Sequence, residues 1–270
     1  MTKKKILITA VVSVLVLLIA GSGGYLLFKH LHMQNDAADF QAAKASAQAS
    51  GSAADSTAAA PTDESGVPLA PNPVNFAYWQ KINPEIYSWI TVPGTEVDYP
   101  VLQSETSDSF YLDHDYEKSY SFAGSIYSQF CNHKDYSDRV TVLYGHNMAN
   151  NSMFASLHAF EDAGFFDAHS EMTVYTPDKR LDYEVVSAYI GDDSHIMNSF
   201  DFSKDAVYRA FLENVLSPHS ISSNVRQGAK LDVSDRILIL STCLDYGEGR
   251  YLVVGKLMNE TPLAPAAPSD

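Results

Sequence analysis

The sequence predicts a mainly β domain, a barrel or sandwich decorated with a few helices, that is held at a membrane by a stalk. Between residues 75 and 258, short runs of β-branched and aromatic residues follow one another too closely for βαβ units. Near the N-terminus, a segment of 23 residues carries no charged side chain. A content of 46% hydrophobic and 11% aromatic residues excludes a wholly disordered chain.

The charge and cysteine content exclude two classes of protein. The 270 residues include 18 Lys and Arg against 33 Asp and Glu, a net charge of -15. Four lysines lie in the first 30 residues, where there is no acid, so the remainder has 14 bases against 33 acids, a net charge of -19. Because so acidic a surface is repelled by phosphate backbones, we expect no nucleic acid as a partner. Two cysteines in the whole chain exclude a disulfide scaffold.

Residues 6–28 are expected to form a transmembrane anchor. At 1.5 Å per residue this segment spans about 34 Å, enough for a hydrocarbon core of about 30 Å. Three lysines precede it and one follows it, so we expect residues 1–5 in the cytoplasm and the rest outside the cell, as in a single-pass membrane protein. The alternative is a cleaved signal peptide, but the apolar run continues past the small residues 21–24, which favours an uncleaved anchor.

Residues 29–74 are expected to be an extracellular stalk rich in Ala, Ser and Pro. Between residues 36 and 65, twelve Ala and five Ser leave Phe40 as the only large apolar side chain. Such a segment cannot bury enough surface to offset the entropy of ordering it. Its Ala-rich first half is expected to be at most transiently helical and to end at about Gly51.

The folded domain is expected at residues 75–258, followed by a flexible, Pro/Ala-rich tail at 259–270. It should begin with a helix over residues 76–90, broken at Asn83-Pro84 and resumed to Trp89. Two further helices are expected over residues 153–160 and 204–216, the second with an apolar face. The strands are expected at residues 97–102, 124–130, 140–144, 173–176, 183–190, 237–242 and 251–257.

A cysteine follows the most apolar of these strands. Residues 237–242 lead to Cys243, six residues with two glycines follow, and Arg250 opens the next strand. If the two strands form a hairpin, Cys243 and Arg250 face each other across its mouth. A guanidinium close to a thiol favours the nucleophilic thiolate, and its N–H groups suit a developing oxyanion.

Of the nine histidines, His146 has the best setting for a proton donor. Strand 140–144 is followed by Gly145, which should let the chain turn sharply so that the imidazole projects from the strand end. A histidine beside a thiol can protonate a departing amine. Spacing alone leaves open that Cys243 is a buried apolar thiol, Arg250 a surface charge and His146 a turn residue. The other histidines lack metal-ligand spacing, so no metal is expected.

Six blocks of sequence follow one another along the domain. They are INPEIYSWI (82–90), PGT with VDYPV (93–95 and 97–101), GSIY (124–127), YGHNM with SMF (144–148 and 152–154), LSTC (240–243) and VVGKL (253–257). In this order they resemble a class B sortase, one of the membrane-anchored cysteine transpeptidases of Gram-positive cell walls. The resemblance spans residues 82–257, nearly the whole domain.

The resemblance implies a closed eight-stranded sortase-type β-barrel with an added N-terminal helix and a helix between strands six and seven. It implies that Cys243 is the nucleophile, His146 the general acid/base and Arg250 the stabiliser of oxyanion and substrate. Ser241 and Thr242 would line the groove beside the thiol. The chemistry implied needs neither a metal nor an organic cofactor.

By the same resemblance, Cys243 attacks the carbonyl after the Thr of a C-terminal sorting motif, of Asn/Ser-Pro-x-Thr type, in a secreted protein. A thioester forms while His146 protonates the leaving amine, and an amine of a peptidoglycan precursor or of a pilin resolves it. Two alternatives stay open: a cysteine hydrolase acting on peptides or peptidoglycan, and a non-catalytic, membrane-tethered surface module. Papain-like hydrolases usually place Cys before His, the reverse of the order here.

The sequence departs from the class pattern at a few positions. Gln129 and Cys131 stand where an acidic and a basic residue are expected, and Gly255 replaces an alanine, which indicates a packing change. Cys131 is either a disulfide partner of the nucleophile or, as we favour, an inert buried thiol. Asp245 and Glu248 make the loop after the nucleophile acidic; a solvated loop is favoured over steering of a basic substrate, and over Asp245 as a third catalytic residue.

Overall fold

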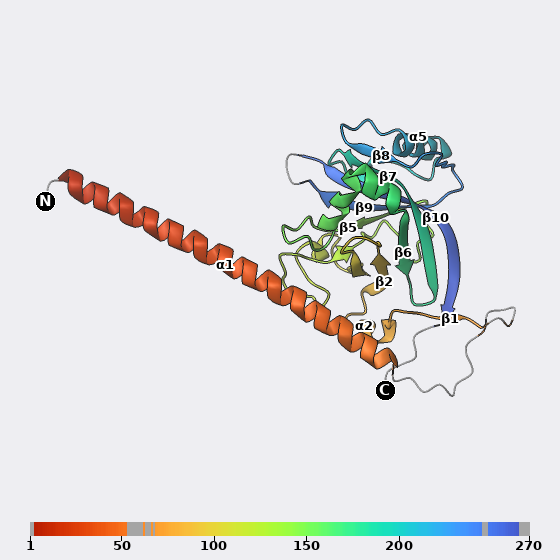
Figure 1. The fold of residues 1–270 in the computed structure, drawn as a ribbon, viewed down its shortest axis with the longest axis horizontal. Helices are drawn as coiled ribbons and strands as arrows, with labels where there is room; N and C mark the ends of the chain where they lie inside the picture. Colours follow the sequence, from red (N-terminus) through yellow and green to blue (C-terminus); the bar gives the residue numbers. More distant parts are fainter. Residues whose placement is uncertain (1–2, 53–61, 63–65, 67, 245–247, 265–270) are drawn as a thin grey trace. The chain divides into compact units, whose positions relative to one another are not determined.

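The computed structural model describes residues 3–52, 62, 66, 68–244 and 248–264 (Figure 1). Residues 53–61, 63–65 and 67 of the predicted stalk and residues 265–270 of the predicted tail therefore lie outside the described residues. The chain divides into two units, residues 1–46 and residues 47–270.

The first unit is part of one long helix, α1 (Lys3–Ser52). Its segment Val11–Gln48 contains a window with a mean hydropathy of 2.3, long and apolar enough to cross a membrane, a test that a signal sequence also passes. The helix continues without a break into the Ala-rich half of the predicted stalk, in keeping with the high helix propensity of alanine.

Eight strands of the described domain close into a barrel (Figure 1). Six neighbouring pairs are antiparallel, and two pairs, β3–β4 and β5–β9, are parallel. The order around the barrel is β10 (Arg250–Ala264), β9 (Ile237–Cys243), β5 (Val140–Tyr144), β4 (Ile126–Tyr127), β3 (Asp98–Leu102), β2 (Ile86–Thr91), β6 (Glu171–Tyr175) and β7 (Lys179–Gly191), which pairs back with β10. Two short strands extend the edges, β1 (Ala70–Pro71) on β10 and β8 (Ser223–Val225) on β7.

Short helices connect the strands, and two of them match the additions that the resemblance implies. Helix α2 (Phe76–Ile82) precedes the barrel, and α5 (Asp205–Leu216) lies between β7 and β9, the sixth and seventh barrel strands in chain order. The predicted barrel with these two helices is confirmed. The remaining helices are η1 (Phe110–Leu112), η2 (Ala155–Glu161), α3 (Ala163–Ala168) and α4 (Ile196–Ser199).

The apolar face predicted for residues 204–216 packs α5 onto the two strands that lead to the predicted site. Tyr208, Phe211, Leu212 and Val215 on α5 are all buried. They share one core cluster with alternate residues of β5 and β9, namely Val140, Val142, Ile237 and Ile239. Since each fully buried side chain of this size contributes about 1.5–3 kcal/mol, this layer fixes β5 against β9.

The predicted resumption of the first helix to Trp89 is wrong. Helix α2 ends at Ile82, Asn83 is extended, and Ile86–Thr91 form β2 between β3 and β6. Pro84 disfavours helical geometry at the residue before it. The strand is buried at five successive positions, so it shows none of the alternation that separates a half-buried strand from a buried helix.

The domain boundary predicted at residue 258 falls inside a strand. Strand β10 runs to Ala264, and residues 259–262 pair with β7 while Leu263 and Ala264 pair with β1. The backbone N–H of Leu263 donates to the carbonyl of Asp178 over 2.7 Å. Strand pairing of this kind is made by backbone groups, so it could not be predicted from the Pro/Ala-rich composition that suggested a flexible tail.

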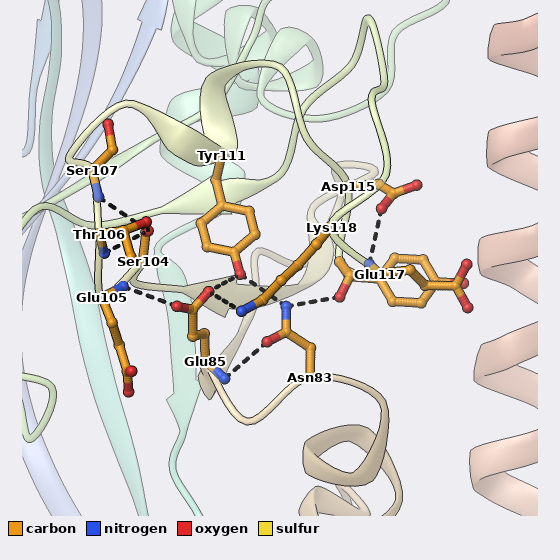
Figure 2. Close-up of polar contacts among 11 residues, drawn as sticks. Asn83, Glu85, Ser104, Glu105, Thr106, Ser107, Tyr111, Asp115, Glu117 and Lys118 are labelled. Atoms are coloured by element: carbon orange, nitrogen blue, oxygen red, sulfur yellow. Dashed lines mark hydrogen bonds and ion pairs between the residues drawn. The ribbon is translucent and has the colours of Figure 1, made fainter.

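A buried carboxylate ties the turn after α2 to the barrel (Figure 2). Glu85, which is 5% exposed, accepts hydrogen bonds from the Tyr111 hydroxyl and from the backbone N–H of Glu105 at 2.9 Å. The ammonium of Lys118 lies 3.0 Å from the same carboxylate. Burial alone would raise the pKa of Glu85, but these hydrogen bonds and the lysine outweigh burial and hold the pKa below its ordinary value.

Because the folded-state pKa of Glu85 is lowered, the ionised carboxylate stabilises the fold at pH values above its ordinary pKa of 4.5. This stabilisation is lost as the pH falls through the lower, folded-state pKa. We expect Glu85→Gln to cost about 1–3 kcal/mol of unfolding free energy at neutral pH, with the difference from wild type shrinking below pH 4.5. Urea unfolding of wild type and Glu85→Gln, at neutral pH and below pH 4.5, measures this difference in unfolding free energy. A difference that does not change with pH would contradict a stabilising role of the ionised carboxylate.

Candidate active site

Cys243 and Arg250 face each other at the mouth of the β9–β10 hairpin. They are register partners, and Nη1 of Arg250 donates to Sγ of Cys243 over 2.7 Å. Gly249 before the arginine has φ +134°, and a Cβ there would meet the carbonyl of Gly191 at 2.9 Å, so the return of the loop requires glycine. The guanidinium therefore stands where negative charge on the sulfur would be stabilised.

The acidic loop of this hairpin is only partly described. Asp245 lies outside the described residues, whereas Glu248 is exposed.

His146 reaches the same edge of the barrel from β5. Strands β5 and β9 run parallel with Tyr144 opposite Ser241. Along both segments the predicted catalytic side chain lies two residues after this pair. Since parallel neighbours end at the same edge, this pairing brings together two residues that are 97 positions apart.

The glycine before His146 is required for space, and not for a left-handed backbone. Gly145 has no positive φ, unlike Gly124 or Gly249. A Cβ on Gly145 would lie 2.5 Å from Cδ1 of Ile126 and 2.8 Å from the ring of Phe154. The close approach of the chain to these two side chains sets where the imidazole leaves the strand.

Cys243, His146 and Arg250 line one cavity of about 190 Å³, together with Ser241. Thr242 does not line it, because side chains alternate along a strand and this one is fully buried on the other face, where its hydroxyl has no hydrogen-bond partner among the described residues. The other lining residues are Leu112, Tyr127, Gln129, Tyr144, Gly145, Asp192, Asp193, Ser194, His195, Ile196 and Leu252.

A backbone carbonyl orients the His146 imidazole. Nε2 of His146 lies 2.7 Å from the carbonyl oxygen of Leu112 in η1. A carbonyl oxygen only accepts, so Nε2 carries a proton and Nδ1 remains available to exchange one. The ring thus has a fixed direction and a defined tautomer.

Sequence reasoning missed the groups that hold the backbone of Cys243, the candidate nucleophile. The carbonyl of Cys243 lies 3.1 Å from both Nδ2 of Asn147 and Nε2 of His158. His158 is itself held by Glu161, 2.6 Å from its Nδ1, and stacks on Tyr251. Asn147 could have been predicted from the sequence, because it directly follows the candidate histidine. His158 could not, because its position depends on the packing of η2.

The rim of the cavity is tied together by Gln129, one of the departures from the class pattern. Its Oε1 accepts a hydrogen bond from Nε2 of His195 over 2.6 Å. Nδ1 of His195 accepts a hydrogen bond from the N–H of Asn198 in α4, so the ring proton must be on Nε2. This bond links the segment after β4 to the connection between β7 and α5.

Cys131 is exposed and is not the buried thiol that the sequence predicted. Strand β4 is only Ile126–Tyr127, so Cys131 lies in the turns beyond it instead of inside a longer strand. Neither Cys131 nor Cys243 takes part in a disulfide bond.

Comparisons with known proteins agree on one family. The family model of the sortase domain matches residues 90–258. A sortase B of Listeria monocytogenes is 34% identical over 184 residues, covering 67% of this chain and 73% of that protein. A sortase B of Staphylococcus aureus is 35% identical over 188 residues, covering 68% and 74%. The X-ray structure of Clostridium perfringens sortase B matches with a TM-score of 0.61 and 36% identity, covering 67% of this chain and 98% of that one.

The contact between Arg250 and Cys243 predicts that the guanidinium increases the reactivity of the Cys243 thiol. In a Cys131→Ser background, which removes the exposed thiol, Arg250→Ala should slow alkylation of Cys243 by iodoacetamide about tenfold, because one charge-assisted hydrogen bond to the sulfur is lost. Arg180→Ala is the matched control, since that guanidinium pairs with Asp182 on β7 and does not line the cavity. Equal alkylation rates in the two arginine variants would show that the guanidinium does not activate the thiol.

Proposed function

The chain belongs to the sortase family as a class B cysteine transpeptidase, and from this premise we propose that it joins secreted proteins bearing a C-terminal sorting motif to an amine at the cell surface. The observation that carries the proposal is the 2.7 Å contact between Nη1 of Arg250 and Sγ of Cys243 in a cavity shared with His146. The residues proposed as nucleophile, cation and proton donor all line this one cavity, which supports the proposal.

In the first half-reaction we propose that the Cys243 thiolate attacks the carbonyl that follows the motif threonine. The oxyanion of the tetrahedral intermediate develops beside the Arg250 guanidinium, which has N–H groups to donate to it. Nδ1 of His146 first takes the proton of the Cys243 thiol and then gives it to the departing amine, while Nε2 stays hydrogen-bonded to the Leu112 carbonyl. The product is a thioester on Cys243 and a released C-terminal peptide.

In the second half-reaction an amine attacks the thioester and the steps run in reverse. His146 accepts a proton from the attacking amine, the thiolate of Cys243 leaves, and an amide forms. The proposed acceptor is an amine of a peptidoglycan precursor or of a pilin, and the proposed motif is of Asn/Ser-Pro-x-Thr type. Both assignments follow from the class.

We propose that residues 6–28 anchor the enzyme in the cell membrane, with residues 1–5 in the cytoplasm. The stalk at 29–74 would then carry the catalytic domain outside the cell. Support comes from the apolar window in α1 and from the excess of lysine before it.

The function is tested with the full chain in detergent, fluorogenic sorting peptides and an added amine. We expect peptide cleavage that depends on Cys243, and diversion of the acyl group to the amide when triglycine is present. Cys243→Ala should lower turnover by at least about a thousandfold, as loss of a nucleophile does, whereas Cys131→Ser should leave it unchanged.

Other outcomes of that assay point elsewhere. Retained turnover in Cys243→Ala would reject the mechanism. Hydrolysis that an amine never diverts indicates a cysteine hydrolase, and binding of peptides without turnover indicates a surface module.

The topology is tested by fractionating cells that express the full chain with a C-terminal tag. We expect the tag in the membrane fraction, accessible to protease added outside intact cells, at the mass of the uncleaved chain. A soluble, N-terminally trimmed product would show that α1 begins with a cleaved signal instead of an anchor.

A further inference from the structure

We propose that Tyr111 and Glu85 are positioning residues for His146, acting through the Leu112 carbonyl that holds its imidazole. This inference rests on the proposed catalytic role of His146. Neither Tyr111 nor Glu85 lines the cavity, so both are argued to act through Leu112 and not on the reacting atoms.

The carbonyl that orients His146 belongs to a segment with little anchorage of its own. Leu112 is the last residue of η1, a helix of three residues, and its side chain is 45% exposed at the cavity rim. Such a short 3₁₀ turn has few internal hydrogen bonds to hold its carbonyl groups in place. Its position must therefore come from neighbouring residues.

The neighbour that anchors η1 is Tyr111, which is 1% exposed. Its hydroxyl donates to the carboxylate of Glu85 and accepts from Nδ2 of Asn83 at 2.8 Å (Figure 2). Its backbone carbonyl accepts from the N–H of Ser125 at 2.9 Å. The residue directly before Leu112 is thus fixed at both its side chain and its backbone.

The carbonyl of Leu112 is also enclosed from one side by the chain itself. Gly124 has φ +56°, and a Cβ there would lie 2.5 Å from the Leu112 oxygen and 2.6 Å from the Tyr111 oxygen. Backbone therefore packs against backbone at this point. With Tyr111 pinned behind it, the Leu112 carbonyl has a defined place in front of His146.

The group that holds the Tyr111 hydroxyl is itself held by hydrogen bonds and a counter-charge. Glu85 is buried in the turn directly before β2, where its N–H donates to Oδ1 of Asn83 over 3.0 Å, and the ammonium of Lys118 balances its charge. Figure 2 shows the carboxylate of Glu85, the ammonium of Lys118 and the amide of Asn83 gathered around the Tyr111 hydroxyl. The turn between α2 and β2 thereby supports the histidine although it contributes nothing to the cavity.

The test compares Tyr111→Phe with Tyr208→Phe in the full-length enzyme. Tyr208 is an equally buried tyrosine of α5 whose hydroxyl also makes hydrogen bonds, to the carbonyl groups of Arg139 and Asp235. Tyr111→Phe should lower kcat for peptide cleavage about tenfold with KM within about twofold, because the imidazole is less well oriented. Tyr208→Phe should lower stability and leave kcat unchanged.

A spectroscopic reading of His146 needs no turnover. With ¹⁵N-labelled histidine and His146→Ala to assign the signal, the wild-type imidazole in its neutral form should carry its proton on Nε2. Tyr111→Phe should shift the ring toward a mixture of tautomers, and Tyr208→Phe should not. Glu85→Gln, which keeps an acceptor for the Tyr111 hydroxyl, should retain most of both properties, while Glu85→Ala should lose them.

A folded Tyr111→Phe enzyme with the kcat and the imidazole signal of wild type would overturn the proposal. Equal losses in Tyr111→Phe and Tyr208→Phe would do the same, since they would show a general cost of removing a buried hydroxyl. If Tyr111→Phe does not fold, the comparison of Glu85→Gln with Glu85→Ala decides by the same two readouts. An inactive wild-type enzyme would reject the proposed function alone, because the imidazole signal still tests the positioning.

Discussion

The parallel pairing of β5 with β9 is the interaction on which the site depends. It sets Tyr144 opposite Ser241, so that His146 and Cys243 leave neighbouring strands at one edge of the barrel. A shift by one residue in this register would send one of the two side chains to the opposite face. The antiparallel hairpin of β9 and β10 then adds Arg250 to the same edge. One strand, β9, thus serves both pairings, and its carboxyl end becomes the place where the chemistry is proposed.

Packing on the outer face keeps this register. Helix α5 lies over β5 and β9, and its buried residues share a core cluster with alternate residues of both strands. The helix between the sixth and seventh strands is therefore more than a connection, because its apolar side chains pack in the same core as the parallel pair.

Sequence reasoning reached as far as local pattern allows. An apolar strand, two glycines and an arginine identified the hairpin of Cys243 and Arg250, because a hairpin joins residues that are near in sequence. The glycine after strand 140–144 pointed to His146, and the resemblance supplied its role and the closed eight-stranded barrel, which no local pattern contains. The contact of His146 with the Leu112 carbonyl was out of reach, since a backbone atom leaves no mark in the residue types. Glu85 was hidden for another reason: it lies in the segment that was predicted to resume the helix after Asn83-Pro84, so its burial against Tyr111 had no pattern to reveal it.

The choice of a carbonyl as the partner of His146 suits the proposed chemistry. In acyl transfer the same imidazole must give a proton to the departing amine and later accept one from the incoming amine. A carboxylate in direct contact would orient the ring but would also stabilise its protonated form, which makes the ring a weaker acid toward the departing amine. The Leu112 carbonyl orients the ring without adding a formal charge. The charged group that secures this carbonyl is Glu85, which contacts Tyr111, the residue before Leu112, and is paired with Lys118. The group that orients the ring thus carries no formal charge of its own, which suits a proposed mechanism in which one histidine both gives and accepts a proton.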